Sequence, residues 1–463
     1  MASREESNDL KKNTIIIAVF NLGSKAITFI LAPLYSYYLT TEQYGSMDLI
    51  TTTASLLLPF ICFDIYEATF RFANDCDYDP KSVFSSSIIV AGIGTFTGAI
   101  IVLIVSLFST LNIYIIFIGI FGILDVFITI MSQFARGRNQ MKVFASSGVI
   151  NAIALLLSNL VFLLLLGLEL KGWLISFLIG KIFVLIYLIR AINFYKYFSF
   201  KSVKKEYIFI FLKFCIPLLP TATMWWIMNV SDRYMLAYFI GTAATGIYSV
   251  SNKFPNIMSS FENVFYQAWQ TTAIRTRNIP DRDDYYSEIL KKYITILLIT
   301  VIGMLTLIKP LIDIMFASQY SSSWICTPFL LLGIIIHAVN GNLGSLYTVF
   351  KHTKGAFYST FIGALSNIIL NLFLIPVAGI IGAALTTLIG YIITFIYRWY
   401  DVKRFTHLSL IDKRLNFLYI LLVLQIILFY FPANWSYLIR MLITIIACYN
   451  NRTLLIGIIR RQK

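Results

Sequence analysis

The stretch VFSSSIIVAGIGTFTGAIIVLIVSLF, residues 83–108, contains no charged side chain. An α-helix rises about 1.5 Å per residue, so about 20 apolar residues are enough to cross the hydrocarbon core of a bilayer. Similar runs recur along the whole chain, which is 58% hydrophobic and only 13% charged. A soluble domain needs about 25% charged residues to keep its surface hydrated. The sequence therefore predicts an all-α polytopic membrane protein.

We expect about 14 membrane spans. The first follows a polar N-terminus and is too long for a signal peptide, so it should remain as a helix. The expected spans lie near residues 13–39, 47–70, 83–108, 112–135, 146–167, 172–189, 208–230, 246–268, 293–308, 324–350, 356–375, 380–397, 415–431 and 436–451.

The net charge of +15 is distributed unevenly over the loops. With the N-terminus inside, the inner loops and the termini hold 29 of the 37 Lys and Arg residues. The outer loops hold three, Lys171, Arg233 and Lys309. Positive residues are retained on the cytoplasmic side of a membrane protein. We therefore expect both termini to be cytoplasmic, and the excess charge is explained by topology rather than by nucleic-acid binding.

The sequence lacks the motifs of cofactor-dependent chemistry. The five cysteines and three histidines are too irregularly placed for a disulfide framework or a metal site. Gly180-Lys181 lacks the rest of a Walker motif, which argues against a nucleotide. The outer loops are too short for a membrane glycosyltransferase or polymerase. We expect no enzyme and no cofactor, and energy from a proton or sodium gradient, from the substrate gradient or from a partner.

Four lysines lie inside the expected spans, and Lys213, near the inner end of the seventh, is expected to reach the interface with its ammonium group. Lys25 is near the middle of the first span, Lys181 near the middle of the sixth, and Lys253 about seven residues below the outer face in the eighth. A charge at the bilayer centre costs about 2.5–3.5 kcal/mol, so it requires a function or a partner. We expect Lys25 and Lys253 to face a hydrated cavity. Two cations with few carboxylates nearby suit an anion such as a phosphate group.

Carboxylates also lie inside the expected spans. Asp64 and Glu67 occupy the inner third of the second span, Asp125 the middle of the fourth, and Glu262 the inner part of the eighth. The first three are candidates for ion coupling. Glu67 and Arg71 are four residues apart on one helix face, so they form either a structural pair or part of a ligand site.

Trp225 and Trp226 stand in the outer third of the seventh span, followed by Asn229. Aromatic residues at this depth form either the interfacial belt or a platform for sugar rings, and the sequence leaves both readings open. A weak internal repeat pairs LTTEQYG, residues 39–45, with IGTAATG, residues 240–246. The two segments are about 200 residues apart, as in transporters built from repeats.

Five further groups of residues occur in a set order. They are APLYSYYLTTEQYG (32–45) with EATFRF (67–72), DRYML (232–236), GIYSVSNK (246–253), FASQY (316–320) and PVAGIIGAALT (376–386). This set resembles bacterial polysaccharide flippases of the Wzx type, which export O-antigen or capsule precursors. They are members of the MOP exporter superfamily and are related to lipid II flippases. The match covers about residues 12–400.

The resemblance implies two six-helix lobes that face each other across a central cavity, residues 1–205 and 206–400. Residues 401–463 would add a helix pair and a cytoplasmic tail. It also implies that an undecaprenyl-diphosphate-linked oligosaccharide passes from the cytoplasmic to the outer leaflet by alternating access. Lys253 stands where related lipid II flippases carry an arginine in a Tyr-Ala-Asp-Arg-Leu segment, which that family uses on the diphosphate. Lysine keeps the charge of arginine but not its bidentate geometry.

Our hypothesis is a flippase of the bacterial inner membrane that holds the diphosphate on Lys25, Lys253 and Lys181, near Trp225 and Asn229. Its partners would be the lipid-linked oligosaccharide, the bilayer and other polysaccharide-assembly proteins. The nearest rival is an ion-coupled multidrug or metabolite antiporter of the same fold, which should have a carboxylate-rich cavity. Two further rivals are a membrane enzyme, which would need a catalytic set on an outer loop, and a scaffold for glycan-assembly enzymes.

Overall fold

The computed structural model describes residues 2–108, 112–277, 279–350, 352–431 and 434–460, and every regular element in these ranges is a helix. Eight of the described helices are long and apolar enough to cross a bilayer. The number becomes nine if Lys205–Leu218 and Ala222–Phe239, which are bent by 44°, form one span. The all-α, multi-pass architecture predicted from hydropathy is therefore confirmed, whereas the count of 14 stays a prediction.

The chain folds into two compact units, unit 1 (Met1–Trp226) and unit 2 (Ile227–Lys463). The division falls inside one helix, α10 (Leu219–Phe239), whereas the sequence placed the lobe boundary at residue 205. The C-terminal helix pair, which we expected as a separate segment, belongs to unit 2.

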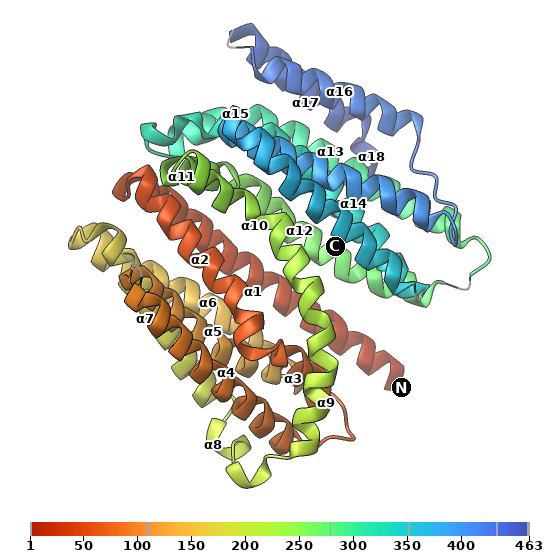
Figure 1. The fold of residues 1–463 in the computed structure, drawn as a ribbon. Helices are drawn as coiled ribbons and strands as arrows, with labels where there is room; N and C mark the ends of the chain where they lie inside the picture. The colour runs from red at the N-terminus through yellow and green to blue at the C-terminus, as the bar shows by residue number, and fades with distance from the viewer. Residues whose placement is uncertain (1, 109–111, 278, 351, 432–433, 461–463) are drawn as a thin grey trace. The chain divides into compact units, whose positions relative to one another are not determined.

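In unit 1, α5 packs against α2, α3, α4 and α7, while α1 packs against α6 (Figure 1). Large apolar side chains fill the space around α5, and the rings of Phe84 and Phe134 lie 4.6 Å apart. The elements are α1 (Ala2–Tyr38), α2 (Thr41–Cys62), α3 (Ile65–Ala73), α4 (Pro80–Phe108), α5 (Asn112–Gly137), α6 (Met141–Asn159), η1 (Leu160–Leu165), α7 (Glu169–Ala191), α8 (Phe194–Tyr197), η2 (Phe200–Ser202), α9 (Lys205–Cys215), η3 (Ile216–Leu218) and the beginning of α10.

In unit 2, α14 packs against α12 and α15, and the additional pair α16 and α17 packs against α13 (Figure 1). Gly379 has a positive φ of 54° and divides α15 into two helices, which correspond to the expected spans 356–375 and 380–397. The elements are the rest of α10, α11 (Thr242–Ser251), α12 (Lys253–Arg275), α13 (Arg282–Met315), η4 (Ser318–Ile325), α14 (Thr327–Val349), α15 (Thr353–Val402), α16 (Lys413–Phe429), α17 (Asn434–Asn450) and α18 (Arg452–Arg460).

The expected second span is broken between α2 and α3. Phe63 and Asp64 both have left-handed backbone angles, with φ of 52° and 56°, so the helix stops and restarts there. Gly94 of α4 lies against this break, because a Cβ atom at that position would stand only 1.8 Å from the carbonyl oxygen of Ile61. Glycine is therefore required where α4 meets the end of α2.

Both segments of the weak sequence repeat lie at a helix start. Thr40 caps α2 through a capping box with Gln43, in which each side chain bonds the other residue's backbone N–H. Gly241, at the corresponding place, precedes α11 with a φ of 117°, a value that favours glycine. The two segments thus use different chemistry for the same turn from one helix into the next.

A second correspondence between the units involves what we call the return segments, residues 197–204 of unit 1 and 405–409 of unit 2. In unit 1, Ser85 of α4 donates a hydrogen bond to the carbonyl oxygen of Tyr197 and accepts one from the N–H of Ser199. Ser86 accepts a further bond from the N–H of Lys204. The first return segment is thereby held against the beginning of α4.

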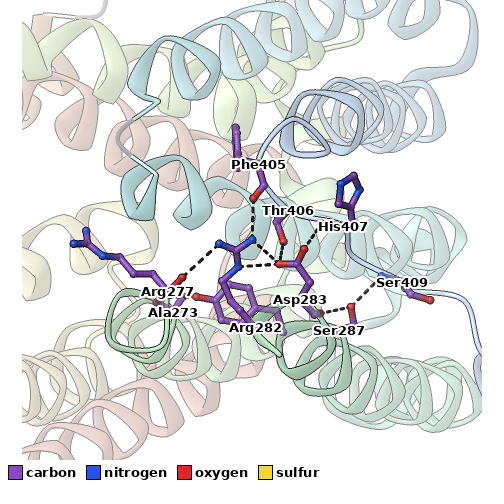
Figure 2. A network of polar contacts seen from close by, with 10 residues as sticks. Ala273, Arg277, Arg282, Asp283, Ser287, Phe405, Thr406, His407 and Ser409 are labelled. Atoms are coloured by element: carbon purple, nitrogen blue, oxygen red, sulfur yellow. Dashed lines mark hydrogen bonds and ion pairs between the residues drawn. The ribbon is translucent and has the colours of Figure 1, made fainter. Parts of the chain in front are cut away.

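In unit 2, the same arrangement holds residues 405–409 against the beginning of α13 (Figure 2). Ser287 accepts a hydrogen bond from the N–H of Ser409, at 3.0 Å. Asp283 accepts bonds from the hydroxyl of Thr406 and the N–H of His407, both at 2.7 Å. Ser287 follows Ser85 by about 200 residues, the period of the internal repeat.

Candidate functional site

The two lysines expected to hold an anion lie in different units. Lys25 is an exposed residue of α1 in unit 1, and Lys253 is a half-buried residue of unit 2. Lys253 is the first residue of α12, directly after Asn252. Asn252 keeps helical backbone angles (φ −78°, ψ −10°), so α11 continues into α12 there and the ammonium charge of Lys253 alone favours an anion.

Lys181, the third lysine, forms a salt bridge with Asp125, a carboxylate expected to take part in ion coupling. The pair joins α7 to α5 and is mostly buried, with 16% and 21% of the two side chains exposed. The ammonium group also lies 5.2 Å from the ring centroid of Phe177. The structure thus brings Lys181 and Asp125 together as an ion pair. We had expected Lys181 to bind an anion and Asp125 to take part in ion coupling, and in this pair each charge neutralises the other.

The other expected pair, Glu67 with Arg71, is not formed in the part of the chain that the structure describes. The guanidinium of Arg71 instead lies 5.2 Å from the ring centroid of Phe214. Arg136 of α5 is the cation near Glu67, and its guanidinium lies 4.3 Å from the ring centroid of Phe70. Glu67 is therefore placed next to a neighbouring helix rather than paired along its own.

Asp64, the remaining carboxylate candidate, stands at the break between α2 and α3 and is 3% exposed. Its backbone carbonyl accepts a hydrogen bond from the thiol of Cys215 at 3.2 Å. The Oδ1 atom of Asp64 is buried and has no hydrogen-bond partner among the described residues. Asp64 thus remains a candidate for ion coupling in unit 1.

The aromatic and amide candidates are partly used inside the protein. Trp226 donates its indole N–H to the carbonyl oxygen of Thr52 at 3.3 Å, which fixes that ring in unit 1. Trp225 is half-buried. Asn229 accepts a hydrogen bond from the hydroxyl of Tyr391 at 2.9 Å, within unit 2. Trp225 stays a candidate for stacking on sugar rings, as predicted from the sequence.

Two buried carboxylates of unit 2 were not expected as site residues. Asp232 of α10 is 4% exposed and binds the hydroxyls of Tyr248 and Thr387. Glu262 of α12 is 7% exposed and forms a 2.9 Å contact with Nδ1 of His337 on α14. The expected spans left Asp232 in an outer loop, and the histidines, His337 among them, were too scattered for a metal site. The sequence did contain one indication of the second pair. Glu262 and His337 both lie inside expected spans, where an ionisable side chain needs a partner.

Outside the apolar segments, two carboxylates stabilise the beginnings of α4 and α13. Burial tends to raise the pKa of Asp79, but hydrogen bonds from the hydroxyl and N–H of Ser82 outweigh it and lower that pKa. Asp283 lies in the polar first turns of α13, ahead of the apolar part of that helix. Burial again opposes the hydrogen bonds from Arg282, His407 and Thr406, and the net pKa of Asp283 is lowered.

Comparison with known proteins assigns the chain to a family. The family model described as "Polysaccharide biosynthesis protein" matches residues 10–270, more than half of the sequence. The chain belongs to the polysaccharide biosynthesis protein family. An uncharacterized membrane protein of Methanocaldococcus jannaschii is 23% identical over 413 residues, which cover 85% of this chain and 98% of that protein.

Solved structures of the MOP superfamily share the fold of this polysaccharide biosynthesis protein. The lipid II flippase MurJ, in an inward closed conformation, has a TM-score of 0.71 at 17% identity and covers 95% of this chain and 100% of its own. An inward-facing multidrug resistance transporter of the MATE family has a TM-score of 0.63 at 12% identity, covering 84% and 95%. The MOP fold inferred from the sequence is therefore confirmed.

Proposed function

We propose that this protein is a flippase for an undecaprenyl-diphosphate-linked oligosaccharide. It moves the molecule from the cytoplasmic to the outer leaflet of the bacterial inner membrane, by alternating access, for surface polysaccharide assembly. Both termini are cytoplasmic, and other polysaccharide-assembly proteins are its partners. No covalent bond is made or broken, because the sugar-phosphate linkage is carried unchanged.

The observation that carries the proposal is the family membership together with the position of Lys253. The half-buried ammonium group at the first residue of α12 places a full positive charge in unit 2. A diphosphate carries the negative charge and the acceptor oxygens that such a position binds. We assign the diphosphate to Lys253, keep Lys25 of unit 1 as the second candidate predicted from the sequence, and leave out Lys181, which forms a salt bridge with Asp125.

The sugar portion is assigned to Trp225. Its half-buried indole offers an aromatic face, and aromatic faces pack on the apolar faces of sugar rings. The neighbouring Trp226 and Asn229 position the helix through their bonds within the protein. Trp225→Ala should thus weaken the transport of long glycans without removing recognition of the diphosphate.

The test is export of surface polysaccharide in cells that carry variants of Lys253. Lys253→Ala should block export and cause the lipid-linked precursor to accumulate, because an uncharged residue cannot bind the diphosphate. Lys253→Arg should retain export, since arginine keeps the charge and adds a second donor. Lys292→Ala is a matched control, because Lys292 is an exposed lysine paired with Glu288 on the polar turns of α13.

Normal export with folded Lys253→Ala protein at wild-type abundance would overturn the assignment. The rival function, an ion-coupled antiporter, shares the MOP fold and makes a different prediction. An antiporter should confer resistance to cationic compounds in a strain that lacks its own efflux proteins. If the protein confers such resistance and its deletion does not affect polysaccharide export, the antiporter function is correct and the flippase function is wrong.

A further inference from the structure

Glu262 and His337 form a buried acid–base pair between two helices of unit 2. Oε1 of Glu262 lies 2.9 Å from Nδ1 of His337, so α12 and α14 are joined by this contact. The carboxylate lies against Gly341, where a Cβ atom would stand 3.7 Å from Oε1. The second oxygen, Oε2, is buried and has no hydrogen-bond partner among the residues that the structure describes.

Titratable groups of three other helices face this pair. Tyr391 of α15 places its ring 5.0 Å from that of His337. Tyr293 of α13 is close enough for its hydroxyl to interact electrostatically with Glu262. Tyr391 interacts electrostatically with Glu262 and also with Asp232 of α10. Lysine is missing from this set, so none of these groups supplies a permanent positive charge.

A tyrosine and an arginine lie next to these groups in the described part of the chain. Tyr266 is on α12 itself, beside Gly341, and interacts with Arg398 of α15. Arg398 is almost completely buried and donates to the hydroxyls of Ser359 and Thr360. The imidazole of His337 is therefore the group in contact with the Glu262 carboxylate that can gain a positive charge.

The charge of this pair depends on one proton. In the tautomer with a proton on Nδ1, a neutral His337 donates to an ionised Glu262, and such a pair carries one net negative charge. When the other ring nitrogen, Nε2, binds a proton, the imidazolium and the carboxylate together have no net charge. An uncompensated buried charge is unfavourable, so bound proton and close contact between α12 and α14 stabilise each other.

We propose that Glu262 and His337 are the proton-binding site that couples a proton gradient to transport. The inference rests on the proposed function and adds the coupling ion and its site. Glu262 and Lys253 are nine residues apart on α12, about 13 Å along the helix. Gain or loss of the proton changes the contact of α12 with α14, and the same helix carries the lysine assigned to the diphosphate. Proton and diphosphate thus act on one rigid element.

The experiment uses the full-length protein in lipid nanodiscs and undecaprenyl diphosphate as the ligand. We measure the dissociation constant between pH 6 and pH 8 in wild type, Glu262→Gln and His337→Gln. Linkage limits one coupled proton to a tenfold change in affinity per pH unit, or a hundredfold over this range, and a ligand-induced change of about one unit in the pKa of the pair gives about tenfold for wild type. Both variants should bind the ligand with an affinity that does not vary with pH.

Two controls carry the same chemical changes on exposed residues, Glu288→Gln and His407→Gln. His407 enters the network at the start of α13 through its backbone N–H, which the substitution retains. Both controls should keep the wild-type pH profile. A wild-type profile in Glu262→Gln and His337→Gln, or a profile that follows sodium concentration instead of pH, would overturn the proton site.

A second measurement separates this inference from the proposed function. The thermal unfolding midpoint of the ligand-free protein should be higher at pH 6 than at pH 8, and Glu262→Gln should remove this difference relative to Glu288→Gln. If undecaprenyl diphosphate binds at no pH, the substrate assignment fails while this measurement still decides the proton site. If Lys253→Ala abolishes ligand binding but keeps the pH-dependent midpoint, both assignments hold. If wild type and Glu262→Gln melt with the same pH dependence, the proton site is refuted.

Discussion

Unit 1 and unit 2 each contain an acid–base pair between helices, but the two pairs differ in the base. Unit 1 joins Asp125 to Lys181, and unit 2 joins Glu262 to His337. Ordinary lysine side chains lose their proton at a pH of about 10.4, whereas ordinary imidazoles do so at about 6.5. A pair with lysine is therefore a permanent structural link, while a pair with histidine can change its charge near neutral pH. Two similar contacts can thus serve stability in one unit and coupling in the other.

The largest expected effect is the loss of the permanent pair. Lys181→Met leaves the Asp125 carboxylate without its counter-charge in a mostly buried position. Breaking such a pair should destabilise unit 1 by about 3 kcal/mol, seen as a lower thermal unfolding midpoint in detergent. The double variant Lys181→Met with Asp125→Leu should recover most of the loss, because no lone charge remains. Equal midpoints for the single variant and wild type would contradict the structural role.

The next effect concerns the return segments, which also differ between the units. Asp283→Ala removes the acceptor for Thr406 and for the N–H of His407, and separates Arg282 from its carboxylate. We expect a loss of about 2 kcal/mol, measured as the unfolding midpoint. Ser85→Ala in unit 1 removes two hydrogen bonds of a neutral hydroxyl and should cost about 1 kcal/mol. A larger loss for Ser85→Ala would reverse this ranking.

The role of the base in each pair can be tested by placing a histidine, the base of the pair in unit 2, into the pair of unit 1. Lys181→His should make the pair with Asp125 titratable, so that its contribution depends on pH. We expect unit 1 to be more stable at pH 5.5 than at pH 8 by about 1 kcal/mol. The measurement is the unfolding midpoint at both pH values in a Glu262→Gln background, which removes the response of unit 2. No pH dependence in that background would show that Asp125 and the new imidazole do not interact.

The smallest effect is expected in acid, at the two helix starts. The lowered pKa values of Asp79 and Asp283 mean that both carboxylates stabilise the folded state above the ordinary carboxyl pKa of about 4. This contribution is lost as the pH falls through the lowered values. Asp79→Asn and Asp283→Asn should each flatten the decrease in unfolding midpoint below pH 4. Asp79 is exposed to water and the Asp283 side chain is 27% exposed, so the change should be small, and larger for Asp283 with its additional contacts.

Hydropathy predicted most of the fold because lipid imposes one simple condition on a spanning segment. Each long apolar run became a helix, and the family resemblance supplied the MOP architecture. The interruptions were harder to predict. Phe63 and Asp64 adopt left-handed angles although neither is a glycine, and only the modest tolerance of aspartate for this region could have indicated it. The break there depends on packing against α4, which local sequence does not contain.

The candidate site was predicted less completely, because contacts between distant residues decide which charges are already neutralised. Lys181 and Lys253 look alike in the sequence, as single lysines inside apolar runs. Asp125 pairs with Lys181 across 56 residues, and only the folded chain shows it. Glu262 and His337 are 75 residues apart and were likewise not connected. The sequence supplied the ionisable residues, and the tertiary structure decides their partners.

The identity of the residue at position 94 predicts one structural feature of related proteins. Its missing side chain admits the carbonyl oxygen of Ile61 into the space that a methyl group would fill. A homologue with any larger residue at that position must either move α4 away or straighten the interruption at Phe63 and Asp64. The residue aligned with Gly94 is therefore a marker that can be inspected in sequences alone, and it sorts relatives into those with a divided second crossing and those with a continuous one.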